Sequence, residues 1–450
     1  MSIALVILAA GKGTRMQSDL PKVLHKLAGA PLLAHAMQSG AALDPQHRVI
    51  VAGHGAEQVT AAAKDHDPEV EVVLQTEQLG TAHAVAQARP ALDGFAGDVI
   101  VLYGDTPFIS EETLQRMCGA RARADVVVLG FEAADPGRYG RLVTDGDTLA
   151  RIVEYKDASE AERAISLCNS GVVCANAETL FQLIDAVGND NASGEYYLTD
   201  IVAIARERGL NATAVTCDEA ETLGINSRPE LAAAEVAFQA RRRAELLEDG
   251  VVMQAPDTVI FAYDTVIGNG AEVEPYVVFA PGVTVESGAR IRAFSHLEGA
   301  HVSQGAIVGP YARLRPGAEL DNDVRVGNFV EVKNAHLHEG AKANHLSYIG
   351  DADVGAGANL GAGTITCNYD GVMKHRTDIG AKAFIGSNTM LVAPVRVGNE
   401  AMTGSGSVIT QDVPDGALAI ARADQQTKPG LARKLVEILK AKKAKQKKEA

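Results

Sequence analysis

A glycine-containing segment near the amino terminus carries residues suited to binding phosphate groups. It reads Leu-Ala-Ala-Gly-Lys-Gly-Thr-Arg-Met over residues 8–16, and Pro21 and Lys22 follow it. Glycine lets backbone N–H groups approach phosphate oxygens, while Lys12, Arg15 and Lys22 supply positive charge. The spacing fits neither the P-loop nor the dinucleotide-binding fingerprint. The segment therefore indicates a nucleotide site of another type.

A carboxylate follows a second apolar run. Residues 98–102 are typical of a buried strand, and Tyr103, Gly104 and Asp105 come directly after it. In open α/β sheets ligands bind beyond the carboxyl ends of the strands, where a carboxylate can hold Mg²⁺ against phosphate oxygens. A lone aspartate after a strand is more often a helix cap or a turn residue. Its combination with the glycine segment and Lys22 favours the metal site.

Further polar residues suit the recognition of hydroxyl groups or proton transfer. In the first half these lie in the segments around Gly140, Glu154 and Asn169, whereas Gln75, Gly80 and Thr81 precede or open a helix pattern and Asn226 closes the domain. In the second half His345 is a candidate for proton transfer, because an unperturbed imidazole has a pKa of about 6.5 and is mostly neutral at pH 7. A single histidine is nevertheless more often structural than catalytic, so His345 needs its neighbours Tyr348 and Asn359 to support the assignment.

Alternating strand and helix patterns position the first group. Residues 2–10 form a continuous apolar run, as expected for a strand buried in a parallel sheet. Strands are also expected over residues 48–52 and 70–74, with a helix over 57–64. These patterns predict a Rossmann-like α/β domain over residues 1–228. A long helix over residues 229–249, with proline at its start and glycine after its end, is expected to link it to residues 250–450.

A spacing of six residues organises the second half. Small aliphatic residues hold this spacing over residues 267–297, 302–332, 337–349 and 379–397. Helices repeat near 3.6 residues and strands near 2, so neither explains it. A parallel β-helix does, because each coil has three short faces with one inward side chain each. Strands of a sandwich would alternate instead of holding one phase over so many repeats.

The six-residue pattern is interrupted once and then ends. Residues 366–378 interrupt it, and loops that leave a repeat stack commonly carry a binding function. The coils are expected to end near Ile409, and a short helix to begin after Pro429. The chain then ends in a basic tail that we interpret as a solvated helix end. Its lysines are Lys440, Lys442, Lys443, Lys445, Lys447 and Lys448.

Composition narrows the classes of protein. A chain of 450 residues exceeds one ordinary core, so two domains are expected. The 42 basic and 57 acidic residues give a net charge of −15, which disfavours nucleic acid as a partner. The five cysteines are scattered, which indicates a reducing compartment without disulfides or a cysteine-based zinc site. We found no signal-peptide pattern or membrane-spanning stretch, so we expect a cytoplasmic protein.

Both halves resemble known transferases. The glycine segment with Pro21 and Lys22 is similar to that of sugar nucleotidyltransferases, and the six-residue run resembles the left-handed β-helix of acyltransferases. Together, in order and over nearly the whole chain except the basic tail, they resemble the bacterial bifunctional family of N-acetylglucosamine-1-phosphate uridyltransferases and glucosamine-1-phosphate acetyltransferases. The resemblance implies acetylation of glucosamine-1-phosphate by acetyl-CoA, followed by UMP transfer from UTP with release of pyrophosphate. These reactions supply precursors of peptidoglycan and lipopolysaccharide.

The resemblance also implies roles in the first domain. Asp105 and Asn226 would be the Mg²⁺ ligands. Arg15 and Lys22 would be catalytic together with Mg²⁺, since phosphoryl-type transfers need alignment and charge neutralisation more than a covalent intermediate. Gly140, Glu154 and Asn169 would hold the amino sugar. The uridyl site would be completed by Leu8, Ala9, Ala10, Gly11, Gln75, Gly80, Thr81, Tyr103 and Gly104.

In the second domain the resemblance implies that His345 takes a proton from the attacking amine. Arg315 and Lys333 would pair with the sugar phosphate, although charged residues at such turn positions are often merely solvated. Tyr348 and Asn359 would orient the sugar. Acetyl-CoA would be lined by Ala362, Asn368, Tyr369, Ser387, Ser405 and Arg422. Some relatives carry alanine at the position of Ser405, so its contact is expected through the backbone. A homotrimer is expected, with this cleft between neighbouring subunits.

The sequence leaves two alternatives open. The first is a sugar nucleotidyltransferase whose β-helix serves only assembly or regulation; His345, Tyr348 and the loop over 366–378 argue against it, because an inert β-helix would not need them. The second is a non-catalytic scaffold with a decayed first domain. The intact residues Lys22 and Asp105 argue against decay.

Overall fold

The computed structural model describes residues 2–146 and 148–449, with side chains near the carboxyl end described as far as Gln446. The chain divides into two compact units. The first is Met1–Glu245 with Phe261–Thr265, and the second is Leu246–Ile260 with Val266–Ala450. Helix α8 (Arg228–Glu248) covers the segment expected to be a linking helix, and most of it belongs to the first unit.

The first unit is built on a mixed sheet. Its strand order is β11-β7-β10-β6-β1-β4-β5, in which β10 runs antiparallel to β6 and β7 and the other pairs are parallel. A hairpin of β8 and β9 extends from β10. The strands are β1 (Ile3–Ala9), β4 (His47–Ala52), β5 (Glu71–Leu74), β6 (Asp98–Tyr103), β7 (Val126–Glu132), β8 (Arg141–Asp145), β9 (Thr148–Val153), β10 (Leu167–Asn176) and β11 (Ala212–Cys217).

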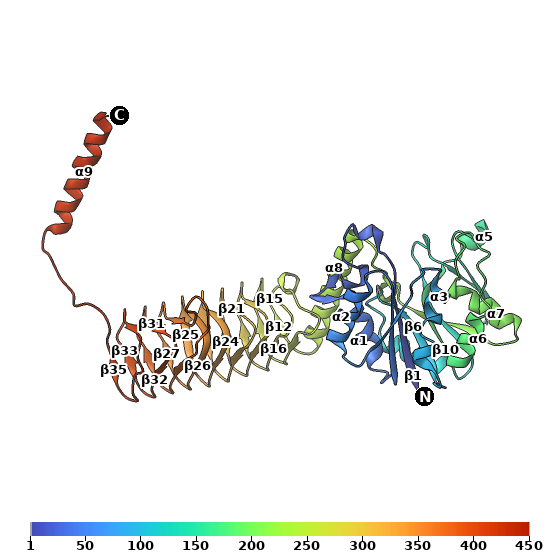
Figure 1. Cartoon of the computed structure of the whole chain (residues 1–450), viewed down its shortest axis with the longest axis horizontal. Helices are drawn as coiled ribbons and strands as arrows, with labels where there is room; N and C mark the ends of the chain where they lie inside the picture. Colours follow the sequence, from blue (N-terminus) through green and yellow to red (C-terminus); the bar gives the residue numbers. More distant parts are fainter. Residues whose placement is uncertain (1, 147, 450) are drawn as a thin grey trace. The chain divides into compact units, whose positions relative to one another are not determined.

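Helices cover both faces of this sheet (Figure 1). One face packs against α1 (Leu32–Ala41), α2 (Ala56–His66) and α4 (Glu111–Ala120). The other packs against α3 (Thr81–Ala86), α6 (Ala177–Ile184) and α7 (Ile201–Glu207). Every residue of β1 is therefore buried, which explains its uninterrupted apolar sequence. The α/β architecture predicted from the alternating patterns is confirmed.

The first part of α8 is an integral part of the first unit. The carboxylate of Glu235 accepts a hydrogen bond from the backbone N–H of Ala28 at 2.8 Å. Gln239 exchanges two hydrogen bonds with the backbone of Phe261, at 2.7 and 2.9 Å. Ala234 packs in a small core with Leu27, Leu32, Phe108 and Ile225. The helix thus covers apolar residues that would otherwise meet water.

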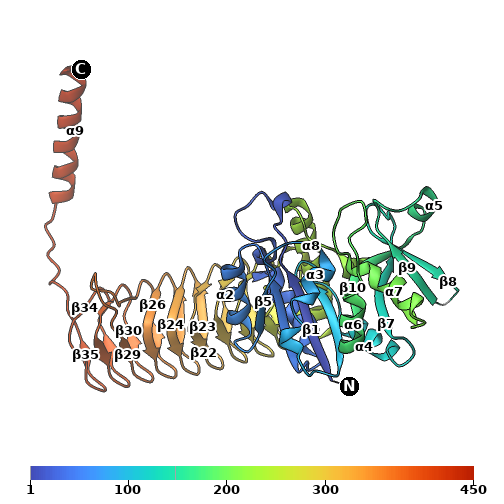
Figure 2. The same ribbon diagram turned by 45° about the vertical axis from the view of Figure 1, so that its right-hand side comes forward.

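The second unit is a parallel β-helix whose coils stack face upon face (Figure 2). The aliphatic residues expected to point inward are buried, from Ile267 at 7% exposure to Val397 at 0%. The six-residue pattern is therefore confirmed as the core of the coils. The first face consists of β12 (Val252–Met253), β14 (Glu272–Val273), β17 (Arg290–Ile291), β20 (Ile307–Val308), β23 (Arg325–Asn328), β25 (Lys342–His345), β27 (Asn359–Leu360), β30 (Phe384–Ile385), β33 (Met402–Thr403) and β35 (Leu418–Ala419).

The other two faces share two long strands that turn a corner, β24 (Glu331–Leu337) and β26 (Tyr348–Val354). The second face contains their first halves with β15 (Val278–Phe279), β18 (His296–Leu297), β21 (Arg313–Leu314), β28 (Ile365–Cys367), β31 (Met390–Val392) and β34 (Val408–Ile409). The third face contains their second halves with β13 (Val266–Ile267), β16 (Thr284–Val285), β19 (Ala300–Val302), β22 (Ala318–Leu320), β29 (Thr377–Ile379) and β32 (Val395–Val397).

The interruption of the coils is shorter than the sequence indicated. Thr366 and Thr377 are both fully buried within strands, so the excursion occupies only residues 368–376. The Thr366 hydroxyl lies 2.8 Å from the Gly350 N–H and 3.0 Å from the Gly350 carbonyl oxygen. Because these backbone partners satisfy the hydroxyl, threonine can occupy an inward position that a search for aliphatic residues misses.

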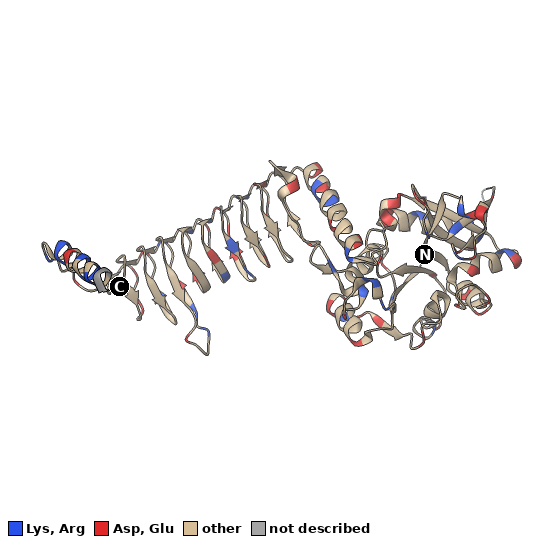
Figure 3. Cartoon of the chain, turned by 90° about the horizontal axis from the view of Figure 1, so that it is seen from above, with Lys and Arg blue, Asp and Glu red and all other residues tan. Residues whose placement is uncertain are grey.

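The carboxyl-terminal helix is longer than predicted. Helix α9 (Leu431–Glu449) has 19 residues, and lysines and arginines recur along it (Figure 3). The side chains of Lys447 and Lys448 lie outside the described residues. Within the described part of the chain, no helix combines the length and the apolar composition that crossing a bilayer requires. All five cysteines are free.

Candidate functional site

A cavity of about 350 Å³ lies at the carboxyl ends of β1 and β6. This is the edge at which open α/β sheets bind ligands. Most residues of the predicted uridyl site line it. They are Leu8, Ala9, Ala10, Gly11, Lys22, Gln75, Gly80, Thr81, Tyr103 and Asp105. The predicted set is thus brought to one cavity from four separate segments of the chain.

Lys22, Asp105 and Asn226 converge in this region. The ammonium of Lys22 forms an ion pair with the carboxylate of Asp105 and donates to Asn226 Oδ1 at 3.0 Å. Asn226 is held by its own N–H, which donates to the Glu230 carboxylate at 2.6 Å. Two oxygen ligands suited to a hard divalent cation therefore face one point, and a cationic side chain already lies there.

The glycine segment approaches Lys22 closely. Gly13 has φ +60°, and a Cβ at this position would lie 2.5 Å from the Lys22 Cβ. The following 3-10 helix η1 (Thr14–Met16) is anchored by the buried side chain of Met16. Arg15 is exposed on this helix and is not a lining residue of the cavity. The structure therefore brings Lys22 into the site and leaves Arg15 at the surface beside it.

Gln75 and the start of α3 form another wall of the cavity. Gln75 is buried, and its amide nitrogen donates to the Gly80 carbonyl at 3.1 Å and lies 3.1 Å from His83 Nδ1. Gly80 has φ +124°, and a Cβ there would lie 2.4 Å from the Tyr196 carbonyl oxygen, so only glycine fits. Burial, with the carboxylates of Glu154 and Asp105 nearby, raises the pKa of Tyr103.

The residues expected to hold the amino sugar also meet. The Asn169 N–H donates to the Gly140 carbonyl at 2.9 Å, and a Cβ on Gly140 would lie 3.5 Å from Glu154 Oε1. The Thr199 hydroxyl donates to Glu154 Oε1 at 3.2 Å. Burial raises the pKa of Glu154. Glu154 also lines a hollow of about 480 Å³ with Tyr155, Lys156, Tyr197 and others.

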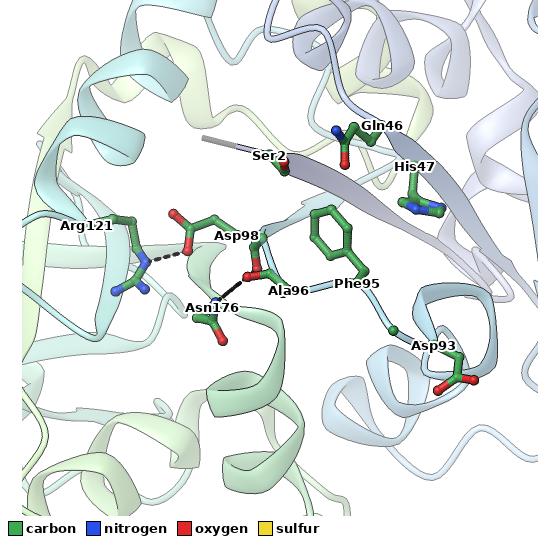
Figure 4. A pocket seen from close by; sticks show the side chains of 11 residues that line it. Ser2, Gln46, His47, Asp93, Phe95, Ala96, Asp98, Arg121 and Asn176 are labelled. Atoms are coloured by element: carbon green, nitrogen blue, oxygen red, sulfur yellow. Dashed lines mark hydrogen bonds and ion pairs between the residues drawn. The ribbon is translucent and has the colours of Figure 1, made fainter.

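A larger hollow of about 600 Å³ lies at the opposite edge of the sheet (Figure 4). It is lined by residues that precede or begin β1, β4 and β6, which is the amino-terminal edge of these parallel strands. In its wall Arg121 Nε donates to the Asp98 carboxylate at 3.1 Å, which forms an ion pair. Neither the edge nor the chemistry matches a nucleotide site, so we interpret it as structural.

In the second unit, the predicted phosphate-binding residues lie in neighbouring coils on the second face. The Arg315 N–H donates to the Val332 carbonyl at 2.9 Å, which places Arg315 beside Lys333. Arg315 also pairs with Glu331 at 2.8 Å. The neighbouring ammonium of Lys374 lowers the pKa of Lys333, and Arg315 adds to the effect. Three cations thus gather here, with the carboxylates of Glu331 and Asp351 beside them.

His345 ends β25 at the corner between the first and second faces, and its side chain is exposed. Its Nδ1 lies 3.1 Å from Asn328 Oδ1, one coil earlier. Asn328 was not among the predicted site residues, although it occupies the position of His345 one coil earlier. In the following coil Asn359 lies opposite Lys342 in the parallel β-ladder. The backbone N–H of Gly363, the residue after Ala362, donates to the His345 carbonyl.

The excursion over residues 368–376 begins beside Tyr348. Asn368 Nδ2 lies 3.4 Å from the Tyr348 hydroxyl and donates to the Asp351 carboxylate, while Tyr369 is exposed. Asp370 accepts hydrogen bonds from the N–H groups of Val372 and Met373 at 2.8 and 2.7 Å. The side chain of His375, with these backbone donors, lowers the pKa of Asp370 to about 2.

The remaining predicted acetyl-CoA residues lie in later coils. Ser387 and Ser405 are exposed, and the Gly406 N–H donates to the Ser387 carbonyl at 2.8 Å, so the two serines lie in adjacent coils. A guanidinium nitrogen of Arg422 donates to the Ser405 carbonyl at 2.5 Å. Ser405 thus contacts Arg422 through its backbone.

Fold and site together define a nucleotidyltransferase joined to a hexapeptide-repeat transferase. Residues 5–216 match the model of the MobA-like NTP transferase domain, and residues 264–299 match that of the bacterial transferase hexapeptide (six repeats). The chain is 70% identical over 444 residues to the bifunctional protein GlmU of a Ruegeria species, covering 99% of each chain. It is 70% identical to that of Ruegeria pomeroyi, covering 100% of each, and 66% identical to that of a Jannaschia species, covering 98% of this chain and 97% of the relative.

The chain therefore belongs to the family of the bifunctional protein GlmU. The expected bifunctional enzyme of UDP-N-acetylglucosamine synthesis is confirmed, with a uridyltransferase in the nucleotidyltransferase unit and an acetyltransferase in the hexapeptide-repeat unit. Nucleotide, sugar-phosphate and acetyl-CoA substrates follow from this membership. The roles of individual residues remain predictions.

Proposed function

We propose that the first unit transfers UMP from UTP to N-acetylglucosamine-1-phosphate with Lys22, Asp105 and Asn226 as its central residues. The observation that carries this is the meeting of these three side chains at the carboxyl edge of the sheet. Oxygen ligands from Asp105 and Asn226 suit Mg²⁺, which would neutralise phosphate charge when bound there. The ammonium of Lys22 occupies the same point and would turn toward a phosphate oxygen.

Alignment is the main task of the remaining residues. The backbone of residues 8–11 with Gln75 and Thr81 lines the cavity proposed for the nucleotide. Gly140, Glu154 and Asn169 would fix the sugar so that its phosphate oxygen attacks the α-phosphorus of UTP in line with the departing pyrophosphate. Lys22 and the exposed Arg15 would offset the charge that accumulates on the phosphates. No side chain needs to act as a nucleophile.

We propose that the second unit acetylates glucosamine-1-phosphate with His345 as general base. The amine nitrogen attacks the thioester carbonyl of acetyl-CoA, the imidazole accepts the amine proton, and the coenzyme leaves as its thiol. Arg315 and Lys333 would bind the sugar phosphate, and their crowding with Lys374 supports an anion site. Tyr348 and Asn359 would orient the sugar. Ala362, Asn368, Tyr369, Ser387, Ser405 and Arg422 would line the coenzyme.

We propose in addition that the enzyme is a cytoplasmic homotrimer, since UTP and acetyl-CoA are cytoplasmic metabolites. A ridge of stacked aromatic rings supports self-association. It consists of Tyr276, Phe294, Tyr311 and Phe329, whose successive ring centroids lie 5.0, 4.9 and 5.3 Å apart. These residues are 48–57% exposed and have φ of 54–62°. A contiguous exposed apolar ridge on a strained backbone is typical of a contact surface.

A coupled assay tests both reactions. Full-length enzyme given glucosamine-1-phosphate, acetyl-CoA, UTP and Mg²⁺ should form UDP-N-acetylglucosamine. Asp105→Asn should stop the reaction at N-acetylglucosamine-1-phosphate, whereas His345→Ala should slow the formation of that intermediate and leave its uridylation intact. If the β-helix served assembly alone, no acetyl-CoA would be consumed, and the second half of the proposal would fail.

A further inference from the structure

The third face of the β-helix carries an outward ladder of histidines and carboxylates that neither reaction uses. His301, Glu319, His336 and Asp353 occupy the same position in four successive coils. Their spacing follows the coil length, so their side chains project in the same direction from the same face. The ladder is densest around His336, where two further ligating side chains meet it.

Asp321 and His338 lie beside the ladder and meet His336. His336 Nε2 lies 2.8 Å from Asp321 Oδ1, and His338 Nδ1 lies 3.1 Å from Asp321 Oδ2. One ligand atom from each residue can be chosen so that all three lie within 4.8 Å of one another. All three residues belong to the second unit and lie on a different face from Arg315.

We propose that Asp321, His336 and His338 bind one divalent transition-metal ion of the zinc class. Two imidazoles and a carboxylate are ligands that Zn²⁺ favours, at about 2.0–2.2 Å. Ligand atoms of a tetrahedral site then lie about 3.4 Å apart, so rotations of exposed side chains suffice to close the site. The three side chains are 35–40% exposed, which leaves room for water as a fourth ligand.

Asp353 provides an independent indication. His338 Nε2 lies 3.1 Å from Asp353 Oδ1, so both ring nitrogens of His338 face a carboxylate oxygen. A neutral imidazole has one N–H, so it can donate to only one of these carboxylates. With Nε2–H donated to Asp353, the Nδ1 lone pair faces Asp321, and either a second proton or a metal ion must lie between them. A carboxylate that orients a ligating histidine in this way is common at zinc sites.

The four residues belong to three successive coils, so a bound ion would stabilise the stacking of the coils. Asp321 belongs to one coil, His336 and His338 to the next, and Asp353 to the coil after that. An ion held there would link successive coils by bonds other than the backbone ladder. Because an ion that binds only the folded chain stabilises it, zinc should raise the unfolding temperature of the β-helix.

Calorimetric titration of chelator-treated full-length enzyme with Zn²⁺ tests the proposal. We expect a site that is lost in His336→Gln and in His338→Gln, and weakened about 10–100-fold in Asp353→Asn. Two matched controls should leave the Zn²⁺ site unchanged. They are His296→Gln on the second face and His301→Gln, two coils before His336 on the ladder. Acetyl transfer, the reaction proposed for the same unit, serves as the folding control for every variant.

Co²⁺ offers a second measurement on the unaltered protein. Bound by two imidazoles and a carboxylate in a tetrahedral site, it should give a visible absorption band that Zn²⁺ abolishes and that His338→Gln lacks. Equal Zn²⁺ binding by wild type and the His336→Gln/His338→Gln double variant would overturn the proposal. So would the absence of Zn²⁺ binding to the wild type, which would mean that protons alone join these side chains.

Discussion

The ammonium of Lys22 contacts the carboxylate of Asp105, 83 positions further along the chain, and the amide oxygen of Asn226, 204 positions further. A single lysine thus closes the gap between the two proposed metal ligands. In this arrangement Lys22 holds the carboxylate and the amide in place. Binding of a cation and a phosphate would release the ammonium toward the phosphate.

Replacement of this lysine should therefore damage uridyl transfer. In Lys22→Ala we expect kcat to fall by about 10²–10³-fold, which is the usual effect of removing one preorganised group that stabilises developing charge. Acetyl transfer should not change. Lys26→Ala, which removes an exposed lysine four positions later, is the matched control. Pyrophosphate release measures the first reaction; an unchanged rate would remove Lys22 from the catalytic machinery.

His345→Ala should lower acetyl transfer by about 10²–10⁴-fold, the usual contribution of general base catalysis, and leave uridylation unchanged. His345→Asn should be almost as slow, since an amide cannot accept the proton. Wild-type rates should fall in acid as imidazole and the substrate amine are protonated, whereas only the amine should contribute in His345→Ala. Rate–pH profiles of the two enzymes separate these titrations. An unaltered rate in His345→Ala would make this residue structural.

The aromatic ridge should control assembly. Charged substitution at its centre, as in Phe294→Asp with Tyr311→Asp, should convert the trimer to monomers in sedimentation, because buried carboxylates would oppose the contact. Met402→Asp, at an exposed apolar residue outside the ridge, is the control and should remain trimeric. A double variant with wild-type sedimentation would show that the ridge is not the contact surface. An active wild-type monomer would contradict the trimer itself.

The two units should act independently, and α8 decides where they can be separated. Residues 1–228 alone should release pyrophosphate from UTP and N-acetylglucosamine-1-phosphate in Mg²⁺. A fragment ending at residue 265 should unfold at a higher temperature, because it keeps the Glu235 and Gln239 hydrogen bonds and the packing of Ala234. Thermal unfolding with activity assays compares them. No activity in either fragment would mean that the division is wrong.

Glu154 should make stability depend on pH. Burial raises the pKa of Glu154 in the folded chain, so above about pH 4.5 the folded state holds a proton that the unfolded state has lost. The free energy of unfolding therefore falls as pH rises through this range. The free energy of unfolding of Glu154→Gln, minus that of wild type, should therefore be larger at pH 8 than at pH 4. Uridyl transfer should weaken in this variant. Denaturant unfolding at both pH values measures the stabilities, with Glu160→Gln as the exposed control. If the difference in stability between Glu154→Gln and wild type were the same at both pH values, Glu154 would not be the source of the pH dependence.

The sequence predicted the β-helix well because its core follows one simple spacing, and Val285, Leu314 and Ile385 all point inward as expected. The residues of the uridyl site were predicted from the resemblance of the chain to the bifunctional transferase family. The sequence did not predict the Lys22–Asp105 contact, because a distance between residues 83 positions apart depends on the whole sheet. Thr366 was missed because its backbone partners were unknown.

The aromatic ridge and the outward ladder of histidines and carboxylates were not predicted, for a different reason. Tyr276, Phe294, Tyr311 and Phe329 recur once per coil, as do His301, Glu319 and His336. A coil here spans 17 or 18 residues, as the pairs Arg313–Glu331 and Glu331–Tyr348 show. A search for residues that repeat every six positions finds the side chains that point inward. A search for residues that repeat every 17 or 18 positions finds the side chains that lie side by side on one outer surface.

The difference between these two periods sets which insertions and deletions the gene can tolerate. Losing six residues between Arg315 and Tyr348 would keep every later aliphatic residue inside, yet turn all following coils by a third of a revolution. The β-helix would survive, but Tyr348 would leave the face that carries Arg315. Losing a whole coil would preserve that face and shorten the stack by about 4.8 Å. Evolution of this half of the chain can therefore change length coil by coil without rebuilding its surface.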